Sequence, residues 1–399
     1  MSSAKNSGPS VDVEAIVAGI ARAIGTNERP VPLHEPRFAG REWDYLKQCL
    51  DSGWVSSAGR FVDEFEARLA TLCGAKAAIA VVNGTAALHV ALRLVDAGPG
   101  DEVIVPALTF VATANAVSYC GAVPHFVDSD ARGLGLDPKK LKLHLERVAV
   151  SRNGVCINSR TGRAIRAVVP VHVFGHPVDM GALKAVCEAF ALPIVEDATE
   201  SLGSSYRGRP CGGLGDIGVL SFNGNKIVTT GGGGALITND VELARHAMHL
   251  TTTAKVEHPW AFVHDEIGWN YRLPNLNAAL GLAQLQQLDG FVAAKRQLAR
   301  RYSEAFAAMP GVTFVAEPEG TASNYWLNAI LLDDDSGAAR DAVLRATRAA
   351  GLLTRPAWTP MHQLAIYQDC PRGDLTVAES IARRLVNLPS SAALGLVGK

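Results

Sequence analysis

The sequence predicts an α/β fold, in which helices cover both faces of a mainly parallel sheet and a smaller α+β domain follows. The chain of 399 residues, 48% of them hydrophobic, is long enough for two packed domains. Between about Ala77 and Thr238, short runs rich in β-branched residues alternate with helical stretches, as in βαβ units. The runs cover 77–82, 101–106, 124–128, 167–174, 193–197, 217–222 and 234–238.

The remaining segments divide the chain into an extension and two domains. Residues 1–30 are expected to be an extension, with 1–10 disordered and a short amphipathic helix from Val11 to Gly25. Residues 31–285 are expected to form the large domain. Asn275–Met309 contains no proline and has hydrophobic residues at helical spacing, which predicts one helix linking the domains. Residues 286–399 mix strand-like and helical runs, typical of a small α+β domain.

Composition narrows the possible partners. The formal net charge of −1 gives no reason to expect nucleic acid or an anionic membrane surface as a partner. The polar N-terminus lacks a secretion signal, and no apolar run has the length of a membrane span.

The seven cysteines never form a CxxC pair, which argues against disulfides and a thiolate zinc site and favours the cytoplasm. The histidines form no HExxH pair or other metal-ligand spacing, so no metal is assigned. No GxSxG or GxxxxGK[ST] motif is present, which argues against the commonest hydrolases and NTPases.

A strand-to-helix turn is the first candidate for binding an anion. Asn83-Gly84-Thr85 follows the first strand and opens an apolar helix, so the amides of Gly84 and Thr85 lie at a helix N-terminus. Such an end binds phosphate, because its amides have no acceptor within the helix. The alternative is an ordinary turn capped by Thr85.

Two charged residues follow later strands. Asp197 ends an apolar strand, where an unpaired carboxylate is costly and requires a cation, such as the protonated ring nitrogen of a pyridine cofactor. The alternative is an Asp that caps the next helix. Lys226 follows another strand and precedes four glycines, and a partly desolvated lysine can form a Schiff base. The alternative is a solvated loop lysine. Phe110 can stack on a flat heterocycle or belong to the core.

Five segments, taken together, resemble the DegT/DnrJ-type nucleotide-sugar aminotransferases, which depend on pyridoxal 5′-phosphate (PLP). The resemblance extends from about Val31 onward and includes the C-terminal RPAWTPMH and VNLPSS. It implies the type I aminotransferase fold, with a seven-stranded sheet in the large PLP-binding domain, and a homodimer with shared active sites. The five segments are NGTAALHVAL, PALTFVATANAV, VEDATESLG, SFNGNK with GGGG, and GWNYRLPNLNAALGLAQL.

The resemblance also implies roles for individual residues. Lys226 would be the Schiff-base lysine and Asp197 the partner of the pyridine nitrogen. Glu200 would lie near the ring hydroxyl, at a position where many relatives carry glutamine or histidine. The phosphate would contact Gly84, Thr85, Ser221 and, from the neighbouring subunit, Asn270, while Phe110 would stack on the ring. The substrate is expected near Trp54, Ser56, Tyr325, Trp326 and His362.

The expected reaction transfers an amino group from glutamate to C4 of a UDP-linked 4-keto-6-deoxy-N-acetylhexosamine. This substrate is expected because the residues of the motifs and the extra amphipathic segment at 11–25 resemble the branch of the family that makes bacillosamine- or legionaminic-acid-type 4-amino sugars. Alternatives are a GDP- or dTDP-linked keto sugar, a cyclitol or aromatic precursor, and a PLP-binding regulator without catalysis. A sugar dehydratase of the same fold would carry histidine in place of Lys226.

Overall fold

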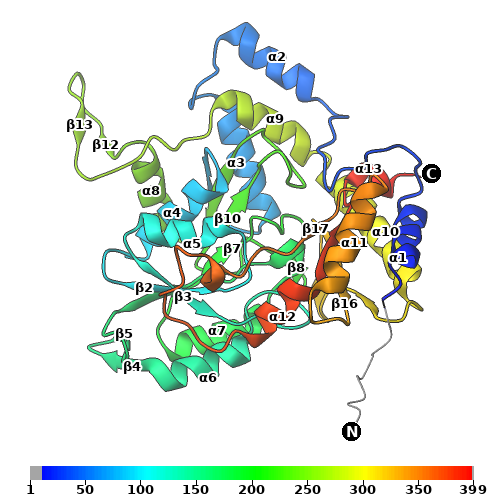
Figure 1. Ribbon diagram of the computed structural model, residues 1–399. Helices are drawn as coiled ribbons and strands as arrows, with labels where there is room; N and C mark the ends of the chain where they lie inside the picture. Colours follow the sequence, from blue (N-terminus) through cyan, green and yellow to red (C-terminus); the bar gives the residue numbers. More distant parts are fainter. Residues whose placement is uncertain (1–10, 398–399) are drawn as a thin grey trace.

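The computed structural model describes residues 11–397, so the expectation for residues 1–10 lies outside it. The seven runs expected as strands form one mixed sheet, in the order β1, β11, β10, β7, β6, β2, β3 (Figure 1). The bridges Val168–Ile194 and Val171–Asp197 connect β6 to β7. Only β11 runs antiparallel to its neighbours in this sheet. The strands are β1 (Ala77–Val81), β2 (Glu102–Pro106), β3 (Val123–Val127), β6 (Ile165–Val168), β7 (Val195–Asp197), β10 (Ile217–Ser221) and β11 (Gly234–Thr238).

Helices cover both faces of this sheet, because successive side chains of each strand point to opposite sides. Ile104 of β2 packs into the core on one face, whereas Val103 and Val105 pack into the core on the other. The first face carries α3 (Arg60–Leu72), α6 (Pro138–Val148), α7 (Met180–Ala189) and α9 (Asn275–Leu285). The second carries α4 (Gly84–Leu94), α5 (Val111–Tyr119) and α8 (Val241–Thr251).

Residues 286–397 form most of a second unit, which we call the small domain. Its antiparallel sheet has the order β14, β16, β18, β17. The strands are β14 (Val312–Phe314), β16 (Asn328–Leu332), β17 (Arg355–Pro356) and β18 (Leu385–Leu388), and the helices are α10 (Leu288–Phe306), α11 (Ala338–Ala349), α12 (Thr376–Arg384) and α13 (Ala392–Gly395).

The single linking helix expected over residues 275–309 is wrong, because the chain breaks between α9 and α10. Helix α9 packs between α2 (Glu42–Ser52) and α3, whereas α10 packs within the small domain, against α1 (Val13–Ile24), α13 and β14. At the break, the side-chain amides of Gln284 and Gln287 both donate to the Glu42 carboxylate, at 2.6 and 2.7 Å. No proline or glycine marks this position, so tertiary packing alone sets the bend.

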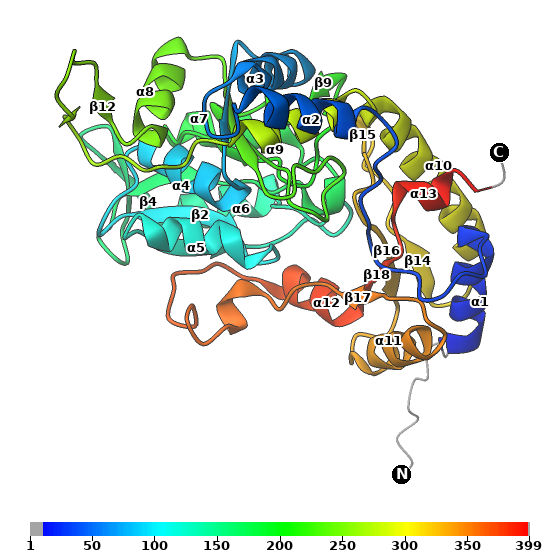
Figure 2. The same cartoon turned by 90° about the horizontal axis from the view of Figure 1, so that it is seen from above.

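Helix α1 (Val13–Ile24), expected as a separate extension, instead packs into the small domain beside α10 and α11 (Figure 2). Ile16 and Ile20 share a hydrophobic core with Tyr302 and Phe306 of α10. The segment that follows stays attached, since the Val31 amide donates to the Gly351 carbonyl at 2.8 Å. Residues 11–30 therefore belong to the small domain through this shared core.

None of the helices within residues 11–397 combines the length and hydrophobicity that a membrane crossing requires.

Short elements complete the described chain. The short strands are β4 (Ala149–Arg152), β5 (Val155–Asn158), β8 (Ser205–Tyr206), β9 (Arg209–Pro210), β12 (Lys255–Val256), β13 (Val263–His264) and β15 (Thr321–Ala322), and the 3₁₀ helices are η1 (Val173–Gly175) and η2 (Met361–Gln363).

We expect Ile20→Ala to lower the free energy of unfolding of the small domain by about 2–5 kcal/mol, because it opens a cavity in a closed core. Urea unfolding followed by circular dichroism measures the change. Glu14→Ala on the exposed face of α1 is the control and should change the free energy by less than about 0.5 kcal/mol. Equal effects of the two substitutions would contradict the packing of α1.

Candidate active site

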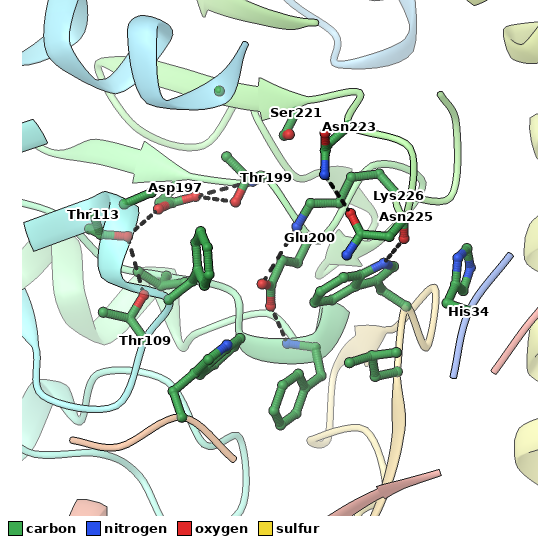
Figure 3. A pocket seen from close by; sticks show the side chains of 18 of the residues that line it. His34, Thr109, Thr113, Asp197, Thr199, Glu200, Ser221, Asn223, Asn225 and Lys226 are labelled. Carbon is green, nitrogen blue, oxygen red and sulfur yellow. Dashed lines mark hydrogen bonds and ion pairs between the residues drawn. The ribbon is translucent and has the colours of Figure 1, made fainter. Parts of the chain in front are cut away.

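A cavity of about 750 Å³ opens at the carboxyl edge of the large sheet, between the two domains. In an open α/β sheet, side chains at the carboxyl ends of the strands meet at this edge. Figure 3 shows Asp197, Glu200, Ser221 and Lys226 gathered around this space. Of the residues expected in the site, the cavity contains Gly84, Thr85, Phe110, Asp197, Glu200, Ser221, Lys226 and Trp326.

Asp197 is the buried end of β7, and its carboxylate is held by two threonines. Oδ2 accepts from the Thr113 hydroxyl at 2.8 Å, and Oδ1 accepts from the Thr199 hydroxyl at 2.7 Å and the Thr199 amide at 3.2 Å. The Thr109 and Thr113 hydroxyls are 3.2 Å apart and extend this chain of bonds. The carboxylate is therefore fixed while it faces the cavity. Asp197 accepts from Thr199 and caps no helix.

Lys226 and Glu200 form a second pair in the cavity. Nζ of Lys226 lies 3.6 Å from Oε1 of Glu200, whose Oε2 accepts from the Phe174 amide at 2.8 Å. Burial raises the pKa of Glu200 to about 7, although Lys226 acts in the opposite direction. Burial also lowers the pKa of Lys226, against the pull of Glu200 and Asp197. Both shifts favour the neutral forms of the pair.

The start of α4 forms another wall of the cavity. Asn83 caps this helix by accepting from the Ala86 amide at 2.8 Å, so Thr85 is not the cap. A Cβ on Gly84 would lie 2.9 Å from Cβ of Ser221, so only glycine lets the helix approach the end of β10 this closely. The helix N-terminus and the Ser221 hydroxyl together form a site that can hold a phosphate group.

These walls match the parts of PLP. The fixed Asp197 carboxylate faces one part of the cavity, and the site at Gly84 and Ser221 that can hold a phosphate lies at another. The desolvated Lys226 lines the same cavity. The Phe110 side chain, 54% exposed, lines the cavity and offers a flat face. The residues present therefore fit the cofactor that the resemblance implies.

The other expected residues lie outside this cavity. Trp54, Ser56 and Asn270 are exposed on the described chain. Tyr325 and His362 are buried, the first against His176 at 5.2 Å between ring centroids and the second bonded to Glu379 at 2.9 Å. Their roles toward phosphate or substrate stay predictions.

Sequence reasoning missed several residues of the cavity wall. Thr199, two residues after Asp197, could have been found as a local hydroxyl partner of the carboxylate. The others come from segments that no motif connects. They include His34, Thr109, Thr113, Asn223, Asn225, Arg355, Trp358 and Asn387.

Comparison with known proteins agrees with this geometry. The model of the DegT/DnrJ/EryC1/StrS aminotransferase family matches residues 36–396. The chain is 40% identical over 362 residues to a GDP-perosamine synthase of Caulobacter vibrioides, covering 90% of this chain and 92% of that protein. It is 37% identical to a GDP-perosamine synthase of Escherichia coli O157:H7, covering 91% and 94%. The crystal structure of DesI in the presence of its TDP-sugar product superposes with a TM-score of 0.80 at 30% identity, covering 94% and 92%.

We expect Glu200→Gln to remove a pH dependence of stability in the cofactor-free protein. The pKa of Glu200 is about 7 in the folded state and near 4.5 in the unfolded state. Between these two pH values, Glu200 is therefore protonated in the folded state and ionised in the unfolded state. Stability is therefore lost as pH rises through that window, by about 1–3 kcal/mol. Urea unfolding at pH 5 and pH 8 measures this loss as the difference between the pH dependences of the wild type and of the variant.

The control for this measurement is Glu304→Gln, which alters an exposed carboxylate of α10. It should keep the pH dependence of the wild type. If Glu200→Gln also kept that dependence, Glu200 would not be the group that retains the proton.

Proposed function

The chain belongs to the DegT/DnrJ/EryC1/StrS aminotransferase family, and from this premise we propose that it transfers an amino group from glutamate to C4 of a GDP-linked 4-keto-6-deoxy sugar. It is a PLP-dependent sugar aminotransferase. The observation that carries the proposal is the grouping of Lys226, Asp197 and the Gly84–Ser221 cradle in one cavity.

The proposed roles follow from the contacts of each side chain. When bound, PLP supplies an electron sink beside the carbon that loses or gains a proton. Asp197, fixed by Thr113 and Thr199, pairs with the ring nitrogen and keeps it protonated. The first amides of α4 and the Ser221 hydroxyl hold the phosphate. Phe110 covers one face of the ring.

Lys226 moves the proton between carbon atoms. Its lowered pKa increases the share of the neutral amine, which is the form that can accept a proton. Glu200, 3.6 Å away, would exchange a proton with Lys226 and, as the resemblance implies, contact the ring hydroxyl of bound PLP. A dehydratase would carry histidine at position 226, so Lys226 favours transamination. The intact set of Asp197, Ser221 and Lys226 also argues against a regulator without catalysis.

The names of the relatives support GDP rather than UDP as the nucleotide of the substrate. Proteins named GDP-perosamine synthase, at 34–40% identity, support a GDP-linked sugar. They do not support the UDP-linked acetamido sugar expected from the sequence. The DesI structure with its TDP-sugar product supports the broader nucleotide-sugar class.

We also propose that the enzyme is a homodimer that shares its active sites. Asn270, expected at the phosphate, is exposed and outside the cavity of its own chain. It follows an arm, residues 252–269 with β12 and β13, that extends from the body of the protein (Figure 1). Trp260, Phe262 and Ile267 on this arm are 84–86% exposed, which fits a surface covered by a second copy.

A substrate panel tests the reaction. UDP- and GDP-linked 4-keto-6-deoxy sugars, each with and without an acetamido group, are incubated with glutamate and analysed by mass spectrometry. We expect the GDP sugar without the acetamido group to have the highest kcat/KM, by about tenfold to a hundredfold, because an unmatched polar group in a pocket is costly. Preference for the UDP-linked acetamido sugar would support the first expectation instead. No amination of any sugar would contradict the proposed function.

Mixing one inactive and one impaired variant tests the shared site. Lys226→Ala should abolish activity, and Asn270→Ala should lower it by about tenfold or more if it binds the phosphate of the partner's cofactor. A mixed dimer then keeps one intact site of two, as two-fold symmetry requires. Equal mixing should restore about a quarter of the wild-type sites by random pairing. Activity no higher than the sum of the separate variants would contradict the shared site.

A further inference from the structure

A loop of the small domain, residues 323–326, reaches the floor of the cavity beside Glu200 and Lys226. Asn324 is fully buried and donates to the carbonyls of Glu200 at 3.0 Å and Leu202 at 2.9 Å. Tyr325 has a φ of 47°, a left-handed conformation that a bulky residue adopts only when its surroundings enforce it. The loop is therefore fixed to the turn that carries Glu200.

Trp326, the last residue of this loop, contacts the lysine segment in two ways. Its indole Nε1 donates to the carbonyl of Asn225, the residue immediately before Lys226, at 2.7 Å. Nζ of Lys226 lies 3.9 Å from the centroid of the indole ring. One side chain thus touches both the backbone and the amine of the lysine segment.

The backbone of Trp326 is held from the side away from the cavity. Its amide donates to Oδ1 of Asn324 at 2.7 Å, and its carbonyl accepts from Nζ of Lys295 at 3.1 Å. Lys295, on α10, is completely buried and also donates to the Ser390 carbonyl. These bonds leave the indole few ways to move relative to the sheet.

We propose that Trp326 is a positioning residue for Lys226, fixing the lysine segment through its indole N–H and holding the Lys226 amine over its ring. Trp326 was expected at the substrate; the proposal assigns it to the lysine instead. The inference rests on the proposed catalytic role of Lys226.

Two physical effects support this role. An aromatic face attracts an ammonium group within about 6 Å, and the attraction is strongest where water is excluded. The ring therefore stabilises the charged lysine that burial otherwise disfavours. A lysine that moves a proton must also stay within reach of the reacting carbon, and a displacement of about 1 Å costs on the order of a hundredfold in rate.

The test compares Trp326→Phe, which keeps a ring and loses the N–H, with Trp326→Leu, which loses both. We expect kcat for the aminated sugar product to fall about tenfold in the first and about a hundredfold in the second. KM for glutamate and for the GDP-linked keto sugar should change less than about threefold, because neither substrate is proposed to bind Trp326. The pH midpoint of the visible absorbance of the bound cofactor should shift more in Trp326→Leu than in Trp326→Phe.

Tyr206→Phe is the matched control, since it alters a buried aromatic residue outside the cavity that likewise loses one donated hydrogen bond, from its hydroxyl to Asp179 at 2.6 Å. It should keep kcat and the absorbance midpoint. The proposal is wrong if Trp326→Phe keeps kcat within twofold, or if its kcat and absorbance midpoint change no more than those of Tyr206→Phe. If Trp326→Leu does not fold, Trp326→Phe decides alone. Retained activity in Lys226→Ala would instead overturn the proposed function.

Discussion

The orientation of the short buried strand β7 is the constraint on which the site depends, because its last two residues are both acidic and both fully enclosed. Glu196 accepts from His172 and from the amides of Gly212, Leu214 and Gly215. Burial acts to raise the pKa of Glu196, and these donors lower it below its usual range. Since successive side chains of a strand point to opposite faces, satisfying Glu196 behind the sheet turns Asp197 toward the cavity. Asp197 then needs only Thr113 and Thr199 to be fixed in place.

The Lys226 and Glu200 pair shows what a closed cavity does to titratable groups. Alone in a desolvated space, each charge would be costly, and their attraction at 3.6 Å offsets only part of that cost. The pKa of Glu200 therefore rises and that of Lys226 falls. The small domain contributes to this closure through the loop at 323–326, so the domain contact and the chemistry of the lysine are linked.

The parts of the molecule that sequence predicts well are those governed by local rules. All seven strands of the large sheet lie within or next to the expected runs, because fully buried strands appear as continuous β-branched runs. Strand ends carrying Asp197 and Lys226 point to a site through the topology of α/β sheets. The break between α9 and α10 leaves no local signal, since it depends on Glu42, more than 240 residues away in the chain. The packing of α1 also leaves no local signal, because its apolar face does not indicate which part of the protein will cover it.

Sequence motifs predict the residues of one half of the cavity better than those of the other. The cofactor half is built from strand ends between residues 83 and 226, each recognisable beside its own strand. The opposite wall comes from Leu33 and His34, from residues 355–358 and from Asn387, which only the assembled small domain brings together. Cofactor motifs therefore fix the reaction type and leave the sugar open, since one site supports many substrates when its second wall changes. The expectation of a UDP-linked sugar rests on the residues of the cofactor motifs and on the segment at 11–25, so no contact of the substrate wall supports it. Names of relatives that match 90% of this chain are the stronger guide to the proposed nucleotide, because the match extends beyond the cofactor motifs.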